Sequence, residues 1–540
     1  MKNKLFSLLI LVFLLTACAP ATPAPPTATP LPPTPVPETG PWWSGQVFYE
    51  IFVRSFNDSN GDGIGDFNGI TAKLDYLNDG DPNTTTDLGV TSIWLMPIFP
   101  SPSYHGYDVT DYYSVNPQYG TMDDFKNLLQ EAHKRGIHVI IDMVLNHTSD
   151  KHPWFKSAKS DVNSPYRDWY IWSDTDPKYS GPWGERVWHP STSGYYYGIF
   201  ESFMPDLNYE NPAVTAEVDR IIRYWLVDLG VDGFRLDAVR HYVEQGKAQE
   251  NTPATHAWLK NFYQYYKGIN PNAFTVGETW TDMASAAQYA GDEVDVSFNF
   301  PLADAFVRTA NSPLTSSASR QMQATLDAYP EGQFAVFLTN HDQNRVMSVL
   351  NDVDKAKLAA VMLLTSPGVP FLYYGEEIGM TGVKPDEDIR RPMQWTSDWP
   401  TVGFTSGTPW RPAADDYPTV NVAAQTDDPN SLLSLYRDLI HLRNSHPALR
   451  TGHTTVIETG SRSVYALLRY NGKEALLVLV NVDSKPVSDY NLKIESGAPN
   501  ALTLLGLPNP SPLPANAGSS GWRPFAELPV RSFAIIQLKP

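Results

Sequence analysis

Two ionisable residues interrupt an otherwise apolar stretch at 231–241, VDGFRLDAVRH, and could carry chemistry. The apolar side chains predict a buried strand, on which residues two apart share a face. Arg235 and Asp237 should therefore project together, away from Phe234 and Leu236. A carboxylate beside a guanidinium stays ionised at neutral pH, which suits a nucleophile or a stabiliser of positive charge. A buried structural ion pair would give the same pattern, so this stretch alone leaves both interpretations open.

Other polar residues stand where further strand-like stretches end, namely His147, Glu278, Asn340, His341 and Asp342. If these ends meet, three carboxylates share one mouth, where they would repel one another, so stability alone would not gather them. Glycoside hydrolysis needs such a set, because one carboxylate attacks the anomeric carbon and one carboxylic acid protonates the leaving oxygen. Asp237 beside Arg235 is the expected nucleophile of low pKa. Glu278, in the apolar stretch VGETW, is the expected proton donor with a raised pKa.

Eight strand-like stretches must position these residues, at 46–53, 91–97, 138–145, 231–241, 274–278, 294–300, 334–338 and 370–374. Helical patterns alternate with them, for example from a Thr121 cap to Gly136 and over 216–229, and the last helix is expected at 431–445. This order predicts an α/β fold of parallel strands with crossover helices. Eight such strands close a (β/α)₈ TIM barrel, whose polar residues converge at the carboxyl ends of the strands.

Two further regions depart from the barrel pattern. Residues 148–208 are rich in Trp, Tyr, Pro and Gly and lack a clear helix, which predicts a B domain inserted after the third strand. The barrel, domain A, then comprises 42–147 and 209–450. Short alternating strands over 451–540 predict a C-terminal antiparallel β-sandwich, domain C.

The first 41 residues have the pattern of an export signal and a tether. Lys2 and Lys4 precede an apolar run at 5–15 that is too short to span a bilayer, so residues 1–17 are predicted to be a signal peptide. LTAC resembles a bacterial lipobox, which makes Cys18 a predicted lipidation site, or else a passenger in an ordinary signal. Residues 18–41, nearly all Pro, Thr and Ala, predict a semi-rigid tether. We expect an extracytoplasmic protein anchored by lipid at the bacterial surface or membrane.

Composition limits the partners. The 540 residues carry a formal net charge of -19, which argues against nucleic acid and against an anionic membrane surface. Contact with a membrane is therefore expected only through Cys18, and a monomer is favoured. Fifteen Trp and 28 Tyr offer flat faces that could stack on sugar rings or serve ordinary packing. With one cysteine in the sequence, intramolecular disulfides and multi-thiolate metal sites are excluded.

The stretch 58–66, DSNGDGIGD, could hold a calcium ion. Its oxygen donors match the opening ligands of an EF-hand loop, with position twelve occupied by Gly69 instead of Glu. A polar Asp/Gly turn is the alternative. The predicted ligands are Asp58, Asn60, Asp62, the Ile64 carbonyl and Asp66.

Four motifs, DMVLNH (142–147), GFRLDAVRH (233–241), GETW (277–280) and FLTNHD (337–342), resemble the four sequence regions of the α-amylase family, glycoside hydrolase family thirteen. The similarity runs from about residue 45 to the C-terminus and is greatest to bacterial lipoprotein α-amylases intermediate between the oligosaccharide and neopullulanase types. It implies a barrel with B and C domains and retaining cleavage of α-glucosidic bonds. It further implies that Asp237 is the nucleophile, Glu278 the acid/base and Asp342 the transition-state stabiliser.

The resemblance also assigns binding residues. The expected substrate contacts are Tyr104, His105, Tyr107, His147, Arg235, Trp280, His341 and Arg345. One or two Ca²⁺ ions are implied, the first in the 58–66 loop. The second would be held by Asn146, Asp206 and the His241 carbonyl, although Asp206 and His241 could serve packing alone.

Residue 104 bears on the type of α-glucan cleavage. Exo-acting α-glucosidases of the family usually carry an Asp there, which blocks the non-reducing end, whereas YHGY (104–107) resembles endo-acting α-amylases. Arg345 would partner such an Asp and keeps the exo alternative open, and MPDLN (204–208) does not decide. We expect an endo-acting α-amylase on α-1,4-glucans. The alternatives are an exo-acting α-glucosidase, oligo-1,6-glucosidase or maltogenic amylase, and more remotely a non-catalytic glycan-binding protein.

Overall fold

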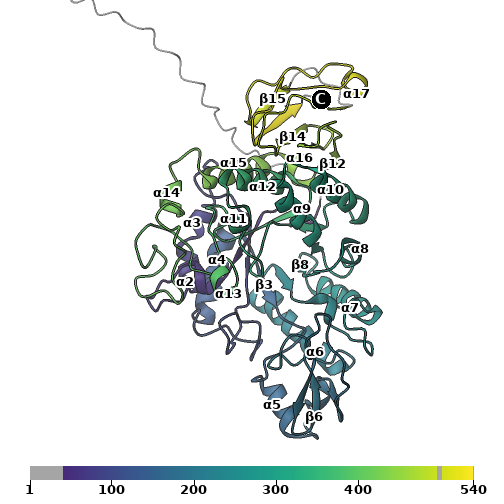
Figure 1. The fold of residues 1–540 in the computed structure, drawn as a ribbon. Coiled ribbons are helices and arrows are strands. Elements are labelled where there is room, and N and C mark those ends of the chain that lie inside the picture. Colours follow the sequence, from purple (N-terminus) through teal and green to yellow (C-terminus); the bar gives the residue numbers. More distant parts are fainter. Residues whose placement is uncertain (1–39, 495–500, 539–540) are drawn as a thin grey trace, which may run out of the picture.

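The computed structural model describes residues 40–494 and 501–538. The predicted signal peptide, Cys18 and the tether up to residue 39 lie outside these ranges. The chain forms a central barrel with a small sheet region around α5 and β6 at one end and the C-terminal sheet at the other (Figure 1). Within the described ranges, no helix has the length and apolar character needed to cross a membrane.

Eight parallel strands close the predicted TIM barrel, in the order β1-β11-β10-β9-β8-β7-β3-β2. All eight predicted strands are present, seven of them with shorter bounds, and the last begins and ends one residue earlier than predicted. They are β1 (Phe48–Ile51), β2 (Ser92–Leu95), β3 (His138–Met143), β7 (Gly233–Leu236), β8 (Phe274–Gly277), β9 (Val296–Phe298), β10 (Phe334–Val336) and β11 (Val369–Tyr373).

Helices surround the barrel and occupy its loops. The longer ones are α4 (Met122–Lys134), α6 (Pro212–Arg223), α7 (Pro253–Ile269), α9 (Phe300–Ala310), α10 (Ser316–Ala328), α12 (Val353–Thr365) and α15 (Leu432–Ser445). The shorter ones are α1 (Val53–Phe56), α2 (Phe67–Ala72), α3 (Leu74–Leu77), α8 (Met283–Ala287), α11 (Val346–Leu350), α13 (Asp386–Ile389), α14 (Val422–Gln425) and α16 (Pro447–Thr451), with a 3₁₀ turn, η3 (Val239–His241).

Local signals explain where two of these helices begin and end. Thr121 and Asp124 form a capping box at the start of α4, as the predicted cap requires. The helix predicted at 216–229 begins earlier, because Asn211 caps it and Pro212 occupies its first turn. Its last six residues, η2 (Tyr224–Leu229), have π-helical hydrogen bonding.

Aromatic side chains fill the barrel interior. Phe48 stacks on Phe371 with ring centroids 4.5 Å apart. At the amino ends of the strands, Trp42 stacks on His138 at 3.8 Å and donates to the Asn272 carbonyl at 2.6 Å. Trp42, near the start of the described chain, therefore covers the end of the barrel at which the strands begin; we call this end the floor of the barrel.

The inserted B region contains a three-stranded sheet of order β4-β6-β5, formed by β4 (Trp172–Ser173), β6 (Gly194–Tyr197) and β5 (Trp188–Ser191), with a 3₁₀ turn, η1 (Arg167–Trp169). The prediction that this region lacks a helix is wrong. Helix α5 (Pro153–Ser160) begins at a His152 cap followed by Pro153, and it buries Phe155 and Ala158. With eight residues and only two buried side chains, its apolar pattern is too short to recognise in a sequence.

The C-terminal region is one antiparallel sheet of order β12-β13-β14-β16-β15. Its strands are β12 (His453–Val456), β13 (Val464–Tyr470), β14 (Ala475–Asn481), β16 (Ser532–Leu538) and β15 (Ala501–Gly506). The second layer of the predicted sandwich consists of irregular chain with isolated bridges Val487–Leu528 and Leu492–Trp522, and a short helix, α17 (Ala517–Ser520).

Candidate active site

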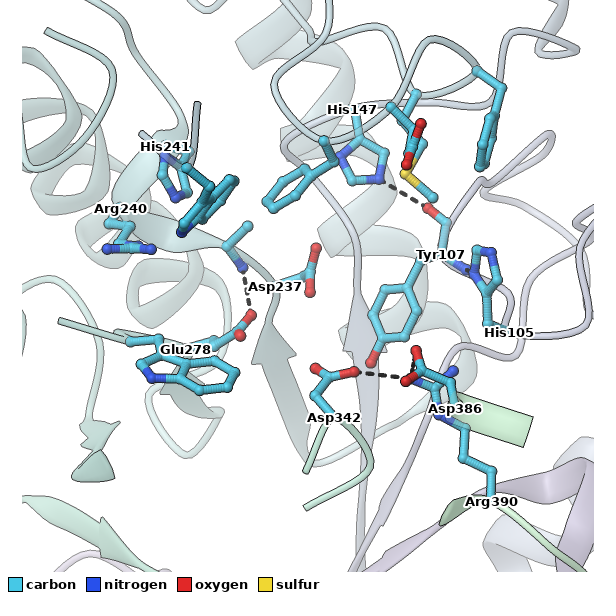
Figure 2. A pocket seen from close by; sticks show the side chains of 17 residues that line it. His105, Tyr107, His147, Asp237, Arg240, His241, Glu278, Asp342, Asp386 and Arg390 are labelled. Atoms are coloured by element: carbon cyan, nitrogen blue, oxygen red, sulfur yellow. Dashed lines mark hydrogen bonds and ion pairs between the residues drawn. The ribbon is translucent and has the colours of Figure 1, made fainter. Parts of the chain in front are cut away.

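A cavity of about 820 Å³ opens at the carboxyl ends of the barrel strands, beside the B region (Figure 2). Seven of the eleven predicted catalytic and substrate-binding residues line it. The lining is His105, Tyr107, His147, Trp183, Phe200, Glu201, Phe203, Met204, Asp237, Ala238, Arg240, His241, Glu278, Trp280, Asp342, Asp386 and Arg390.

Strand register brings the central charged residues together. Asp142 on β3 pairs with Arg235 on β7, and the Glu278 amide donates to the Leu236 carbonyl at 3.0 Å. Asp237 directly follows β7, so the ends of three adjacent strands supply one cluster. Ala238 adopts a left-handed conformation with φ 51°. This turns its amide to donate to Glu278 at 3.1 Å.

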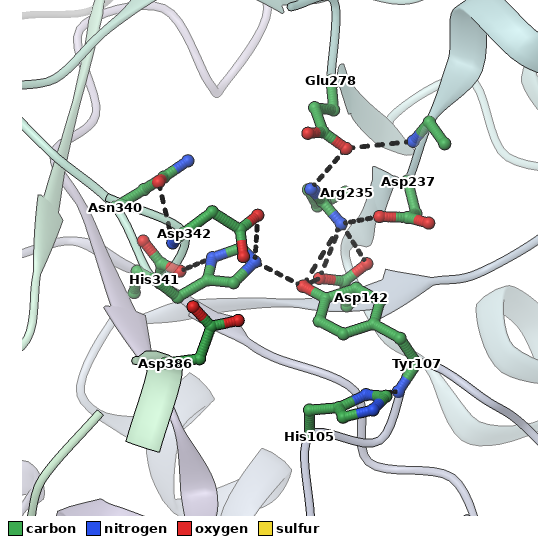
Figure 3. Close-up of polar contacts among 12 residues, drawn as sticks. His105, Tyr107, Asp142, Arg235, Asp237, Glu278, Asn340, His341, Asp342 and Asp386 are labelled. Atoms are coloured by element: carbon green, nitrogen blue, oxygen red, sulfur yellow. Dashed lines mark hydrogen bonds and ion pairs between the residues drawn. The ribbon is translucent and has the colours of Figure 1, made fainter. Parts of the chain in front are cut away.

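One buried guanidinium joins three carboxylates (Figure 3). Arg235 is 1% exposed and contacts Asp142 at 2.9 Å, Asp237 at 2.7 Å and Glu278 at 2.8 Å. The predicted shared face of Arg235 and Asp237 is confirmed. Sequence reasoning quoted Asp142 within a motif but gave it no role, because only the register of β3 on β7 shows that it faces Arg235.

The prediction of a low pKa for Asp237 is wrong. Burial, the largest cause, raises the pKa of Asp237 above its usual range, and the carboxylates of Glu278 and Asp142 add to the effect. Arg235 offsets only part of this increase in the pKa, because its single positive charge is shared by three carboxylates. Asp237 therefore binds a proton more readily than an exposed aspartate would.

The low pKa belongs to Asp342 instead. Its Oδ2 lies 3.2 Å from His341 Nε2, its Oδ1 lies 2.8 Å from Arg390, and these cations hold the pKa of Asp342 well below its usual range despite burial. His341 also contacts Glu50 at 2.5 Å. Burial alone would lower the pKa of His341, but Asp342 and Glu50 raise it to about 10. Asp342 and His341 thus form a charged pair at neutral pH.

Tyr107 connects the two charged groups. Its hydroxyl donates to Asp142 at 3.0 Å and accepts from His341 Nε2 at 2.7 Å. His147 donates from Nε2 to the Tyr107 carbonyl at 3.0 Å, and burial lowers the pKa of His147 to about 4, so this imidazole is neutral. His105 Nδ1 accepts from the Tyr107 amide at 3.1 Å.

Four predicted substrate contacts do not line this cavity. Arg235 and His341 are buried beside its carboxylates, and the other two are Arg345 and Tyr104. Arg345 is 2% exposed and donates to the carbonyls of Ile389 at 2.9 Å and Tyr374 at 2.6 Å, so its charge is used inside the protein. Tyr104 stacks on Trp410 at 5.6 Å and lines a neighbouring cavity of about 580 Å³. The assignment of Arg345 is corrected, because its guanidinium binds backbone carbonyls. The Tyr104 ring lies 6.0 Å from the guanidinium of Arg390, which contacts Asp342, and its role in substrate binding stays a prediction.

Arg390 and Asp386 take the place expected for Arg345 and were missed. Arg390 contacts both Asp342, at 2.8 Å, and Asp386, at 3.1 Å. Both residues lie on or beside α13, within the long segment between β11 and α15. That segment has neither helical nor strand periodicity, so the only signal was a pair of arginines in a loop.

Aromatic side chains stand at the mouth. Trp280 is 45% exposed and stacks on Phe300 at 4.7 Å, and Trp183 is 56% exposed and stacks on Phe200 at 5.7 Å. Such flat exposed faces suit contact with sugar rings.

The first predicted calcium loop wraps around Asp58. Its carboxylate accepts from the amides of Asn60, Gly61 and Gly63 at 2.7 to 2.9 Å. Asp66 caps α2 by accepting from Gly69 at 2.6 Å. Between residues 40 and 494 and in 501–538, no three His, Cys, Asp or Glu side chains are grouped as a metal site. A calcium ion here would thus depend on amide and carbonyl oxygens as well as carboxylates.

The second predicted calcium position contains buried carboxylates. Asn146 donates to Asp206 at 3.1 Å, and Glu244 lies next to Asp206. Burial raises the pKa of Asp206 to about 7. The Asn146 Oδ1 and Glu244 Oε1 atoms are buried without a hydrogen-bond partner among the described residues. His241 uses Nδ1 to donate to the Gln249 carbonyl at 2.8 Å. Unpaired buried oxygens of this kind fit a hard cation.

Known proteins share this sequence and fold. Residues 50–452 match the family described as "Alpha amylase, catalytic domain". The chain is 42% identical over 450 residues to "Alpha-amylase 3" of Dictyoglomus thermophilum, covering 82% of this chain and 86% of that protein. It is 34% identical over 530 residues to "Oligo-1,6-glucosidase" of Parageobacillus thermoglucosidasius, covering 82% and 91%. The solved structure of an α-amylase from H. orenii superposes with a TM-score of 0.81 at 44% identity, covering 92% of this chain and 100% of that one.

Proposed function

Since the chain belongs to the α-amylase family, glycoside hydrolase family thirteen, we propose that it is a retaining, endo-acting α-amylase. Its substrates would be the internal α-1,4 bonds of starch and maltodextrins. The observation that carries the proposal is the grouping of Asp237, Glu278 and Asp342 in one cavity with no carboxylate at residue 104. The aromatic faces of Trp183 and Trp280 at the mouth support a chain that extends beyond the cavity.

In this mechanism Asp237 attacks the anomeric carbon while Glu278 protonates the leaving glycosidic oxygen. Water then cleaves the glycosyl–Asp237 ester, and Glu278, now a carboxylate, takes a proton from that water and so regains its acid form. The reaction needs Glu278 in its acid form and Asp237 as a carboxylate. Arg235 contacts both carboxylates, so it stays paired in either step. Asp342, held ionised by His341 and Arg390, would stabilise positive charge on the sugar ring.

The decisive test uses maltoheptaoside whose non-reducing end is chemically blocked. Cleavage of the blocked sugar by the purified protein from residue 42 onward would support endo action, because the chain must then extend on both sides of the cut. Release of glucose from the unblocked sugar alone would contradict it. The exo-acting alternative, favoured by the likeness to an oligo-1,6-glucosidase, would replace it.

We also propose that Ca²⁺ binds at Asn146, Asp206 and the His241 carbonyl, with Glu244 nearby, and in the 58–66 loop. The unpaired oxygens of Asn146 and Glu244 support the former, and the all-oxygen donor set supports the latter. An ion at either place would stabilise the fold by linking the chain segments that bind it. Chelation followed by Ca²⁺ titration should raise the melting temperature, and less so in Asp206→Asn. An unchanged melting temperature would argue against both sites.

The N-terminal signal supports a further proposal, that lipid on Cys18 anchors the protein outside the cytoplasm. The expected result is that Cys18→Ala protein is released into the medium, whereas the parent sediments with membranes. Equal release of both would count against the anchor.

A further inference from the structure

Glu50 is a buried carboxylate beneath the cavity that the proposed reaction does not use. It lies on β1 two residues after Phe48, so the two side chains share the face of the strand that points into the barrel. Phe48 stacks on Phe371 in the barrel interior, whereas Tyr49 and Ile51 belong to the core on the outer side of the strands. Glu50 therefore stands one layer nearer to the carboxyl ends of the strands, and it is 2% exposed.

The His341 imidazole pairs with this carboxylate. Glu50 Oε1 lies 2.5 Å from His341 Nδ1, and no other basic side chain of residues 40–494 and 501–538 forms an ion pair with Glu50. The second ring nitrogen faces the cavity, where Nε2 lies 3.2 Å from Asp342 Oδ2 and 2.7 Å from the Tyr107 hydroxyl (Figure 3). One ring therefore joins a carboxylate of the barrel interior to the carboxylate proposed to stabilise the sugar cation.

These two contacts require a charged imidazole. An ionised carboxylate only accepts hydrogen bonds, so each ring nitrogen that faces one must carry a proton. Carboxylates face both nitrogens of His341, Glu50 at Nδ1 and Asp342 at Nε2. A ring with a single proton would leave one of these carboxylates without the donor that faces it.

No neighbouring group of the described chain takes the place of Glu50. The other titratable side chains around His341 and Glu50 are Tyr107, Asp142 on β3, Arg235 on β7, Tyr373 on β11, Glu376 after β11 and Arg390 beside α13. Asp142 is contacted by Arg235 at 2.9 Å. Burial raises the pKa of Glu376 to about 8, so this carboxyl group is mostly neutral at pH 7. Glu50 is therefore the carboxylate that balances the charge on the Nδ1 side of the ring.

Resting on the proposed function, we propose that Glu50 is a positioning residue of the active site, which orients the His341 imidazole and keeps it charged, so that a cation faces Asp342 during the reaction. Glu50 does not line the cavity, so it acts through His341 and not on the substrate. An ionised Asp342 stabilises positive charge that develops on the sugar in the transition state. Loss of Glu50 should therefore affect kcat more than KM.

The test is a double-mutant cycle, with kcat and KM measured from the new reducing ends formed from maltoheptaose. Glu50→Gln keeps a hydrogen-bonding group beside the ring and removes the charge. It should lower kcat about ten-fold or more and change KM less than about two-fold. In the His341→Gln protein, adding Glu50→Gln should lower kcat by less than about two-fold, because the group through which Glu50 acts is already absent.

Glu293→Gln is the matched control. Glu293 is 1% exposed and contacts Nδ1 of His256 at 2.9 Å, so it is also a buried glutamate paired with a histidine, but neither residue lines the cavity. This variant should keep the kcat of the unaltered enzyme. Equal losses of kcat in Glu293→Gln and Glu50→Gln would overturn the proposal, because loss of any buried charge would then suffice. Additive losses in the Glu50–His341 cycle would overturn it as well.

The charge of His341 can be measured without altering Glu50. In protein labelled with ¹⁵N-histidine, nuclear magnetic resonance at pH 8 should show both ring nitrogens of His341 protonated, with their signals assigned by their absence in His341→Gln. In Glu50→Gln one of the two nitrogens should have lost its proton. A neutral His341 in the unaltered protein would overturn the proposal, even if Glu50→Gln failed to fold.

The outcome does not depend on endo action. Both endo and exo cleavage of maltoheptaose form new reducing ends, so an enzyme that fails on the blocked maltoheptaoside would still test Glu50. An unaltered protein that cleaves no maltoheptaose would overturn the proposed function and, with it, the role of Glu50.

Discussion

At the scale of single residues, the pKa values of the carboxylates in the site depend on how many cations contact each of them. One cation, Arg235, contacts Asp142, Asp237 and Glu278, whereas Asp342 is contacted by two cations, His341 and Arg390, which also contact Glu50 and Asp386 respectively. Consequently, the pKa of Asp237 lies above its usual range and the pKa of Asp342 lies below it, although both line the same cavity. The sequence predicted Arg235, Asp237 and Glu278 but gave Asp142 no role, and it assigned the low pKa to Asp237 instead of Asp342, since charge sharing depends on neighbours from other strands.

The nucleophile can be tested by one substitution. Asp237→Asn keeps the shape of the side chain and a hydrogen-bond acceptor for Arg235, but removes the attacking carboxylate. Turnover should fall by about 10⁴-fold or more, with an unchanged far-ultraviolet circular dichroism spectrum and retained binding of maltotriose by calorimetry. Near-normal turnover would refute the assignment of Asp237 and with it the proposed mechanism.

The His341–Asp342 pair predicts a pH dependence of stability. The folded-state pKa of His341, about 10, lies above its unfolded value of about 6.5, so its stabilisation is complete below that value and disappears as pH rises toward 10. Asp342 has the opposite sign, because its stabilisation is lost only when acid protonates it. Between pH 7 and 10 the unaltered protein should lose more stability than His341→Gln, by on the order of 4 kcal/mol at most.

Thermal unfolding of both proteins across that range checks the expectation. Other groups titrate in both and cancel in the difference. Parallel pH curves would show that His341 is not charged in the folded protein.

At the scale of elements, the character of the paired strands explains why the barrel could be predicted from the sequence. Alternation of strands and helices was sufficient to expect the barrel, because buried parallel strands are apolar throughout and end in polar residues. The segment between β11 and α15, by contrast, is held by ion pairs and by Arg345 on backbone carbonyls. Such contacts leave no periodicity, so Arg345 was placed in the cavity and Arg390 was overlooked.

Gly233 tests how closely β7 and β8 must approach. A β-carbon there would lie 1.9 Å from the Phe274 carbonyl oxygen, so the strands would have to separate. Gly233→Ala should lower the free energy of unfolding by about 3 kcal/mol or more, measured with urea. The matched control is Gly268→Ala in α7, where nothing lies within 4 Å of the added atom. That control should gain about 0.5 to 1 kcal/mol. Equal stabilities of the two variants would mean that the β7–β8 spacing is adjustable.

At the scale of the whole molecule, the buried Arg469 joins the C-terminal sheet to the barrel, and Arg443 on α15 holds the same barrel segment from the other side of the chain. Arg469 on β13 donates to the Thr365 carbonyl at 2.7 Å, at the end of α12. Arg443 donates to Leu364, Ser366 and Gly368 at 2.7 to 3.0 Å. Cations at the carboxyl end of a helix are stabilising. Neither contact could be expected from sequence, because a buried arginine that binds carbonyls has no charged partner to reveal it.

Arg469→Met should therefore loosen this junction. We expect a loss of about 2 kcal/mol, seen as a lower melting temperature, because the Thr365 carbonyl is left buried without its donor. Arg462→Met removes an exposed arginine from the same domain and should change little. Equal melting temperatures for all three proteins would indicate that the sheet stays docked through apolar contacts alone.

The floor of the barrel, closed by Trp42 against His138, has a directional consequence. The chain enters the fold at the amino ends of the strands, and the cavity opens at their carboxyl ends. If the predicted anchor at Cys18 holds the protein at a membrane, the amino ends of the strands would face the membrane and the cavity would face away from it. An α-glucan could then reach the cavity directly from the surrounding medium, and the products would leave by the same open end of the barrel.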